Sequence, residues 1–144
     1  MAEQKPAEHH KHNEIVIDAT NAVLGRLASF AAKQALLHKK VIIVNCAAAI
    51  VTGNRKNVIE EYKEIRATGG SSLAGPFFPK NPERIMKRTI RGMVSYKQGR
   101  GLDALKRVIC YNNVPEQYQN AKKILAGKEK KTYTTKLSEL SKEI

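Results

Sequence analysis

The chain has 144 residues, 42% of them hydrophobic, and its 26 lysines and arginines against 13 acidic residues give a net charge of +13. The length favours one domain with a sizeable core, and the charge indicates a nucleic acid as partner, with an anionic membrane surface as the weaker alternative. No apolar run approaches the roughly 20 residues that span a bilayer, and no secretory signal precedes the charged region, so we expect a cytoplasmic protein.

Cysteine and histidine give little sign of a metal site. Cys46 and Cys110 form no C-x-x-C motif, and each ends a predicted strand, where cysteine usually acts as a small buried hydrophobic side chain. His9, His10 and His12 form a short tract that can attract a metal ion, but we favour a mobile tail over residues 1–13. We expect neither a metal nor a cofactor.

The domain that we expect over residues 14–144 begins with alternating strand and helix patterns. Residues 14–19, EIVIDA, predict a strand whose consecutive β-branched side chains are buried on both faces. A helix is predicted over residues 22–38, with a choice of N-caps among Asp18, Thr20 and Asn21. A second apolar strand follows over residues 41–46, and this order predicts a parallel pair joined by the helix.

The middle of the chain is less regular. Residues 47–51 are either a connection or a third strand, and residues 54–67 predict an amphipathic helix with mixed surface charge. Residues 68–80 form a glycine- and proline-containing loop. Its Phe77 and Phe78 can stack on nucleic-acid bases, although we favour packing of both rings on their own domain.

The C-terminal part contains one more strand, over residues 108–111, and a turn over residues 112–115. A third amphipathic helix ending at Gly127 is predicted from Tyr118, Ala121, Ile124 and Leu125. Residues 136–144 are weakly amphipathic. Several lysines in this part form either a second nucleic-acid contact or a soluble tail: Lys122, Lys123, Lys128, Lys130 and Lys131.

Residues 81–107 contain the strongest functional signal, and Lys80 stands just before them. Asn81, Pro82 and Glu83 are typical of a helix N-terminus. At helical spacing one face presents Met86, Ile90 and Met93 to a core, and the opposite face presents Arg84, Arg88 and Arg91, with Lys87 beside them. We expect a flexible basic loop around Lys97, Gly99, Arg100 and Gly101, and then a short helical turn over residues 102–107.

A row of cations is often no more than a solvated helix face, but such faces usually mix charges so that ion pairs form. This row is almost entirely positive, and the planar guanidinium group suits phosphate oxygens. The chain also lacks a recognisable catalytic motif. Asp18 ends a buried strand, where an acid can be catalytic, but capping of the next helix explains it as well. His38 suits the dipole of a helix C-terminus.

Several short motifs occur in a fixed order between residues 14 and 141. They are Ile17-Asp18-Ala19, Leu24-Gly25-Arg26-Leu27-Ala28-Ser29, Ala32-Lys33, Val41 to Asn45, Val51-Thr52-Gly53, Gly75-Pro76, Pro82, Arg91-Gly92-Met93 and Gly101. Together they resemble the universal large-subunit ribosomal protein family called L-thirteen. Val114-Pro115 and Leu137-Ser138-Glu139-Leu140-Ser141 resemble its archaeal and eukaryotic branch, and the short C-terminus is similar to archaeal members.

The resemblance implies a single-domain, three-layer α/β/α fold with a four-stranded, mainly parallel sheet. It also implies that large-subunit ribosomal RNA and neighbouring ribosomal proteins are the partners, with a role in early subunit assembly. The predicted RNA-binding residues are Lys80, Arg84, Lys87, Arg88, Arg91, Lys97, Arg100 and Lys106, extended by Arg26, Arg55 and Lys56 if their turns share the same edge. The alternatives are an RNA- or nucleotide-modifying enzyme with Asp18 as its acid, and a DNA-binding protein, for which no groove-reading motif is visible.

Overall fold

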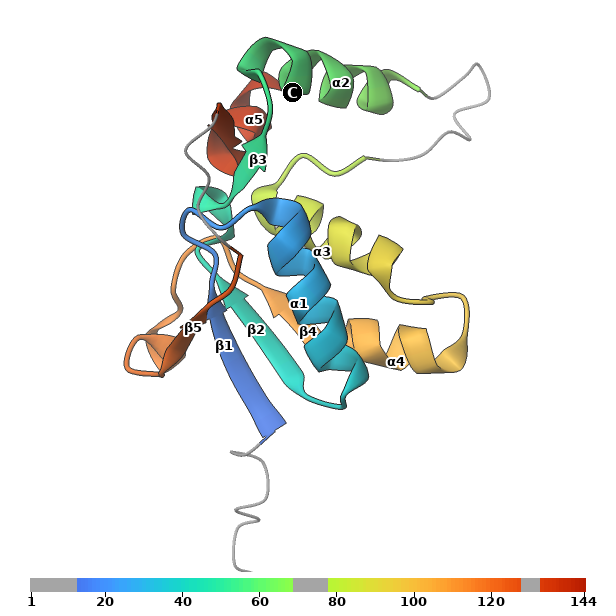
Figure 1. Ribbon diagram of the computed structural model, residues 1–144, viewed down its shortest axis with the longest axis vertical. Coiled ribbons are helices and arrows are strands. Elements are labelled where there is room, and N and C mark those ends of the chain that lie inside the picture. The colour runs from blue at the N-terminus through green and yellow to red at the C-terminus, as the bar shows by residue number, and fades with distance from the viewer. Residues whose placement is uncertain (1–12, 69–77, 128–132) are drawn as a thin grey trace, which may run out of the picture.

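The computed structural model describes residues 13–68, 78–127 and 133–144 (Figure 1). Some expectations therefore lie outside the described residues. They concern the tail up to residue 12 with its histidine tract, Phe77, and the lysines Lys128, Lys130 and Lys131.

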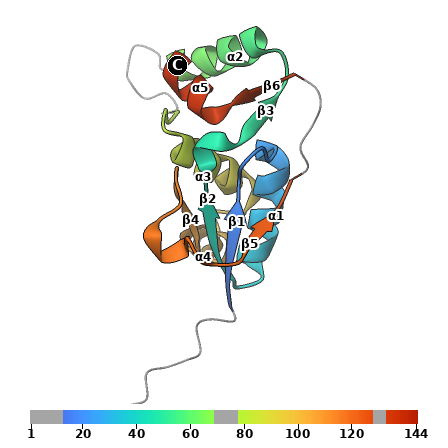
Figure 2. The same ribbon diagram turned by 90° about the vertical axis from the view of Figure 1, so that its left-hand side faces the viewer.

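Four parallel strands form the central sheet, in the order β4-β2-β1-β5 (Figure 2). β1 (Glu14–Asp18) pairs with β2 (Lys40–Val44) on one side and with β5 (Lys123–Leu125) on the other. β4 (Val108–Cys110) pairs with the outer side of β2. The expected α/β fold with a four-stranded parallel sheet is confirmed.

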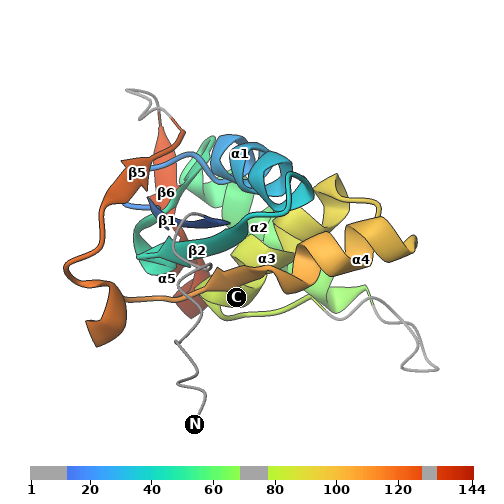
Figure 3. The same ribbon diagram turned by 90° about the horizontal axis from the view of Figure 1, so that it is seen from below.

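Three helices cover one face of this sheet: α1 (Leu24–Leu36), α3 (Pro82–Met93) and α4 (Gly99–Lys106) (Figures 1 and 3). The expected burial of the strands on both faces is also confirmed. Side chains alternate along each strand, so that Ile17 and Ile43 pack with the helices while Val16 and Ile42 belong to a separate core on the other face. Small side chains let α1 lie close to its neighbours: Ala28, Ala31, Ala32 and Ala35 are all buried.

The other face of the sheet is covered by the chain after β4, which contains a single 3-10 turn, η3 (Glu116–Tyr118). The prediction of a helix ending at Gly127 is therefore wrong. The described chain forms η3 and then enters β5, whose residues hydrogen-bond along the free edge of β1. Pairing with β1 satisfies backbone groups at that edge, and this long-range gain outweighs the local helical periodicity.

A second, smaller unit lies beyond the carboxyl ends of β1 and β2, at the top of Figure 1. The chain passes through the 3-10 turn η2 (Cys46–Ala48) into β3 (Ile50–Thr52), which pairs antiparallel with β6 (Thr134–Lys136). α2 (Arg55–Ala67) and α5 (Leu137–Glu143) cover this two-stranded sheet. Residues 47–51 thus lead into a strand, and the amphipathic end of the chain is a helix with Leu137 and Leu140 buried.

The ends of α1 differ from the prediction. Its N-cap is Val23, with no side-chain cap, so none of the three polar candidates before it is the cap. Its last helical residue is Leu36, and His38 lies beyond the helix in the left-handed conformation, with φ 64°. None of the helices in the described part of the chain is both long and apolar enough to cross a bilayer.

The basic stretch differs from the prediction at one point. Gly99 and Gly101 belong to the first turn of α4 instead of a flexible loop. A Cβ atom built on Gly101 would collide with the backbone carbonyl of Ser95, so glycine at this position lets α4 lie directly on the chain that follows α3. The segment between α3 and α4 is therefore a packed turn.

Candidate nucleic-acid interface

α3 separates an apolar face from a cationic one, as its sequence predicts. Pro82 stands in the first turn, and the side chain of Asn112, in the turn after β4, accepts a hydrogen bond from the Glu83 N–H at 3.1 Å. Ile85, Met86 and Ile90 are buried against the sheet and α1. Met93, which we expected on this face, is 42% exposed because α3 ends there.

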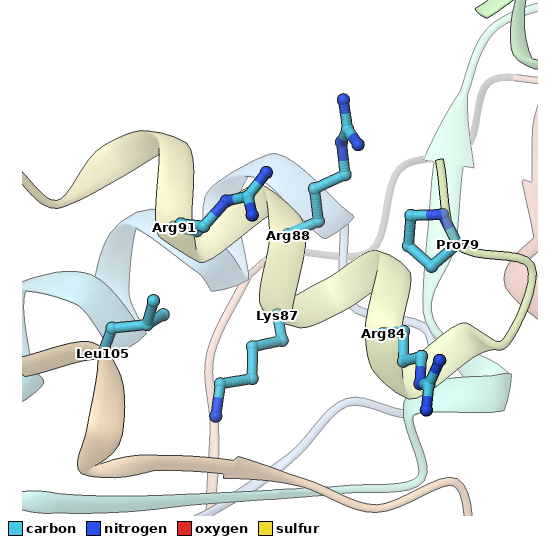
Figure 4. Close-up of a pocket in the computed structure, with 6 residues that line it drawn as sticks. All are labelled: Pro79, Arg84, Lys87, Arg88, Arg91 and Leu105. Carbon is cyan, nitrogen blue, oxygen red and sulfur yellow. The ribbon is translucent and has the colours of Figure 1, made fainter. Parts of the chain in front are cut away.

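The cationic face of α3 borders an open hollow of about 330 Å³ (Figure 4). Six residues line it: Pro79, Arg84, Lys87, Arg88, Arg91 and Leu105. Four of the six are cations and none is acidic, and Leu105 comes from α4, so the hollow lies where α3 and α4 meet. We call the three guanidinium groups at Arg84, Arg88 and Arg91 the arginine row.

Two basic residues beside the arginine row hold the fold together. The Lys87 Nζ donates a hydrogen bond to the backbone carbonyl of Val108 at 3.0 Å, and this ties α3 to the edge strand β4. In Figure 4 its side chain points away from Arg88 and Arg91. Arg107, just after α4, donates to the Ala35 carbonyl in the last turn of α1 at 3.0 Å, where a cation also suits the helix dipole.

Arg88 and Phe78 stack on one another. The Arg88 guanidinium carbon lies 4.7 Å from the centre of the Phe78 ring, which meets Tyr62 of α2 edge-on at 5.2 Å. Phe78 is half-buried and packs on the main core. The interpretation that this ring packs on its own domain is therefore confirmed, and the stacking fixes the direction in which Arg88 leaves α3.

Arg91 also has an aromatic neighbour, Tyr96, which was not among the residues predicted from the sequence. Its guanidinium carbon lies 5.3 Å from the centre of the Tyr96 ring, in the turn between α3 and α4. Tyr96 is 39% exposed. A tyrosine within a run of lysines and arginines is a pattern seen in nucleic-acid-binding proteins, and this signal could have found it.

The remaining predicted residues of the basic stretch are all exposed. Lys80 precedes α3, Lys97 lies in the turn after it, and Arg100 and Lys106 lie on α4. No ion pair joins them to an acidic residue within the described ranges. They do not line the hollow, but they extend its positive charge on both sides.

The structure separates Arg55 from the hollow. Arg55 begins α2 and lies 3.4 Å from Glu143 and 4.0 Å from Glu139, both on α5, so its charge is partly neutralised. Lys56 is the next residue of the same helix and is exposed. Neither lines the hollow. The expectation that this turn extends the arginine row therefore gains no support from the geometry.

Arg26 lies in the first turn of α1, exposed, beside Gly25. A Cβ atom built on Gly25 would meet nothing within 4 Å in the described structure, so internal packing does not explain the glycine. The α1 and α3 surfaces meet close by, because the Ser29 hydroxyl reaches the Met93 sulfur at 3.5 Å. Arg26 thus belongs to the helical side of the molecule but not to the hollow itself.

Asp18 has a structural task at the end of β1. Its Oδ1 accepts hydrogen bonds from the Thr20 N–H at 3.0 Å, the Thr20 hydroxyl at 2.7 Å and the Asn45 amide at 3.1 Å. Partial burial raises its pKa, but these hydrogen bonds and the charge of Lys123 outweigh burial, so the net pKa lies below its ordinary value. A carboxylate that is ionised at neutral pH and accepts several hydrogen bonds stabilises the turn and is a poor proton donor.

The two cysteines are structural as well. Cys46 is buried and Cys110 is half-buried, and both are free thiols. The hydrogen bond with Cys110 and burial raise the pKa of the Cys46 thiol far above its ordinary value. Cys46 therefore stays protonated and unreactive at neutral pH.

Comparison with known proteins gives a consistent set of relatives. Residues 12–117 match the family model described as Ribosomal protein L13. The chain is 46% identical over 110 residues to the large ribosomal subunit protein uL13 of Methanosarcina barkeri, covering 76% of this chain and 78% of that protein. It is 46% identical to uL13 of Methanococcoides burtonii, covering 74% and 76%, and 43% identical to uL13 of Thermoplasma volcanium, covering 74% and 78%.

Proposed function

Because the chain belongs to the ribosomal protein L13 family, we propose that it binds large-subunit ribosomal RNA through the arginine row and the cations around it, and stabilises the folded RNA during early subunit assembly. Members of this family are structural proteins of the cytoplasmic ribosome and not enzymes. Neighbouring large-subunit proteins are the further partners that we propose.

The observation that supports this proposal best is the composition of the hollow. A surface depression lined by four cations and no acid is costly for an isolated protein, because like charges repel. A polyanion relieves that repulsion and releases its own bound counterions, which is the main source of affinity for nucleic acids. The row from Arg84 to Arg91 is about 10 Å long at 1.5 Å per helical residue, enough for several backbone phosphates.

The mode of recognition that we propose is contact with the RNA backbone and with RNA shape. One guanidinium group can bind two phosphate oxygens at once through two parallel hydrogen bonds. Phosphate contacts position a protein on nucleic acid without reading its sequence. Helix α3 cannot enter the deep, narrow major groove of an RNA helix, so its arginines are suited to the outside of folded RNA. Packing holds α3 in place, and Arg88 is further oriented by its stacking on Phe78.

The test removes two charges from the row. With the double variant Arg88→Ala and Arg91→Ala, we expect weaker binding to large-subunit ribosomal RNA purified from Methanosarcina barkeri. The slope of log affinity against log salt concentration should flatten by about 1–2 units, since each lost phosphate contact removes about 0.7–0.9. Filter binding or fluorescence anisotropy over a series of salt concentrations measures this slope.

A matched control removes two charges elsewhere. Lys63 on α2 and Lys142 on α5 are exposed and lie outside the predicted interface. The double variant Lys63→Ala and Lys142→Ala should keep the wild-type slope. If the arginine variant also keeps it, the arginine row is not the RNA interface; if wild-type protein shows no salt-dependent binding, RNA binding itself is wrong.

A further inference from the structure

The turn between α3 and α4 presents an aromatic ring to solvent within the most cationic part of the molecule. We propose that the Tyr96 ring, paired with the Arg91 guanidinium, is a stacking site for one unpaired base of ribosomal RNA. The inference rests on the RNA-binding function proposed above and goes beyond it, because the arginine row alone predicts contacts to phosphates only.

The Tyr96 ring is held in its exposed position by the fold. Val94, two residues before it, is buried and anchors the end of α3 in the core. The Gln98 N–H donates to the Ser95 carbonyl at 3.0 Å, and α4 lies against that same carbonyl at Gly101, where no side chain fits. The turn is therefore closed from both sides, and the ring is exposed without being on a loose loop.

The Arg91 guanidinium group lies over the Tyr96 ring. The guanidinium carbon is 5.3 Å from the ring centre, which is the distance of a cation–π contact. With 39% of the residue still exposed, the ring keeps surface for a second planar group. Arginine beside tyrosine is a frequent platform for unstacked bases, because the base stacks while the guanidinium binds its phosphate.

The charge around Tyr96 favours RNA over an apolar protein segment as the occupant. Between Glu83 and Asp103 the chain contains no acidic residue, and Lys97 in the turn and Arg100 at the start of α4 are both exposed. An apolar peptide gains nothing from this field, whereas an RNA strand is attracted by it and offers bases for stacking. Tyrosine loses little conformational freedom on binding, which makes it a suitable fixed contact.

A competing explanation is that Tyr96 only orients Arg91 for a phosphate. The two possibilities differ in their salt dependence, because stacking contributes to affinity without releasing counterions. With Tyr96→Ala we expect roughly 5- to 100-fold weaker binding to the Methanosarcina barkeri RNA and an unchanged salt slope. Tyr96→Phe, which keeps the ring, should bind like wild type.

A second variant reports stacking directly. The protein contains no tryptophan, so Tyr96→Trp introduces a single one, whose fluorescence can be excited separately from that of the remaining tyrosines. We expect its fluorescence to be quenched on RNA binding. The control is Tyr118→Trp, on the opposite face of the sheet, which should change little.

Two sets of results would overturn the inference. In the first, the Tyr96→Ala variant binds RNA as tightly as wild type, or its salt slope falls by about one unit, as expected for a lost phosphate contact. The other is equal quenching at positions 96 and 118, or no quenching at either. In each case wild-type protein that still binds RNA with a steep salt dependence leaves the proposed function standing, whereas loss of wild-type binding removes both.

Discussion

At the scale of single residues, the cations near α3 divide into two groups. Lys87 and Arg107 donate to backbone carbonyls of β4 and α1, and so stabilise the fold. Arg84 and Arg91 are exposed at the hollow. The sequence predicts a continuous positive stretch, but it cannot show this division, because the carbonyl that each side chain meets comes from a distant element.

Gly101 has a different role from the one predicted, because it packs α4 against Ser95 and is not part of a flexible loop. Replacement by alanine would press a methyl group against the backbone carbonyl of Ser95, which cannot move aside as a flexible side chain could. We expect Gly101→Ala to lower the free energy of unfolding by about 1–3 kcal/mol, the usual cost of overpacking. Urea denaturation measures the loss.

Gly99 supplies the control for this substitution within the same helix. A Cβ atom on Gly99 would meet nothing within 4 Å. Gly99→Ala should therefore cost nothing, and it should even stabilise slightly because alanine favours the helix. Equal losses for both variants would show that the close contact between α4 and Ser95 is not the cause.

Asp18 gives the protein a pH dependence whose direction is set by its lowered pKa. Because the folded-state pKa lies below the unfolded value near 3.8, ionised Asp18 stabilises the fold above that value, and this contribution is lost as the pH falls through the folded pKa. We expect wild type to be more stable than Asp18→Asn at about pH 6, with the difference shrinking toward about pH 3. Thermal melts at several pH values test this, and a constant difference would contradict it.

At the scale of elements, the C-terminus of α1 shows a well-defined end. The His38 N–H donates to the Ala35 carbonyl at 3.1 Å and the Lys39 N–H to the Gln34 carbonyl at 3.2 Å, which is the Schellman pattern. This pattern requires the left-handed conformation at His38, a position where glycine is usual. The sequence has no glycine there to indicate the end, so the predicted helix extended two residues too far at its C-terminus.

His38→Gly should therefore stabilise the protein. We expect the free energy of unfolding to rise by about 0.5–1 kcal/mol, because glycine adopts positive φ without the steric cost that a side chain causes there. The greater conformational freedom of glycine in the unfolded chain offsets part of this gain. Lys39→Gly, where φ is not positive, is the control and should give no gain. Chemical denaturation compares the three proteins; a loss of stability for His38→Gly would mean that the imidazole has a stabilising contact.

β5 is a strand in a segment that was predicted to be helical. Together with Tyr118 and Ala121, the residues Ile124 and Leu125 have the spacing of an apolar helix face, but Ile124 and Leu125 also fit a short strand. What decides between them is the unpaired edge of β1, which lies more than a hundred residues away in the chain. By contrast, β1, β2, β4, α2 and α3 were predictable, because their patterns are long or their ends bear clear signals such as Asn54 and Pro82.

At the scale of the whole molecule, the path of the chain concentrates the cations. α1, α3 and α4 all lie on one face of the sheet, and the return from β4 to β5 passes over the other face (Figure 3). The arginine row was predictable because it belongs to one helix. Leu105 and the pairing of Arg91 with Tyr96 were not, because they depend on how α4 packs against α3.

If the arginine row attaches this protein to the large ribosomal subunit, as we propose, sedimentation of the protein with the subunit should depend on that row. Extracts of cells producing either wild type or the Arg88→Ala and Arg91→Ala variant are run through sucrose gradients at low and high salt. We expect wild type to sediment with the large subunit and to leave it only at high salt or not at all, and the variant to be released at lower salt. Wild type found at the top of the gradient as a free protein, even at low salt, would show that this protein is not held on the large subunit.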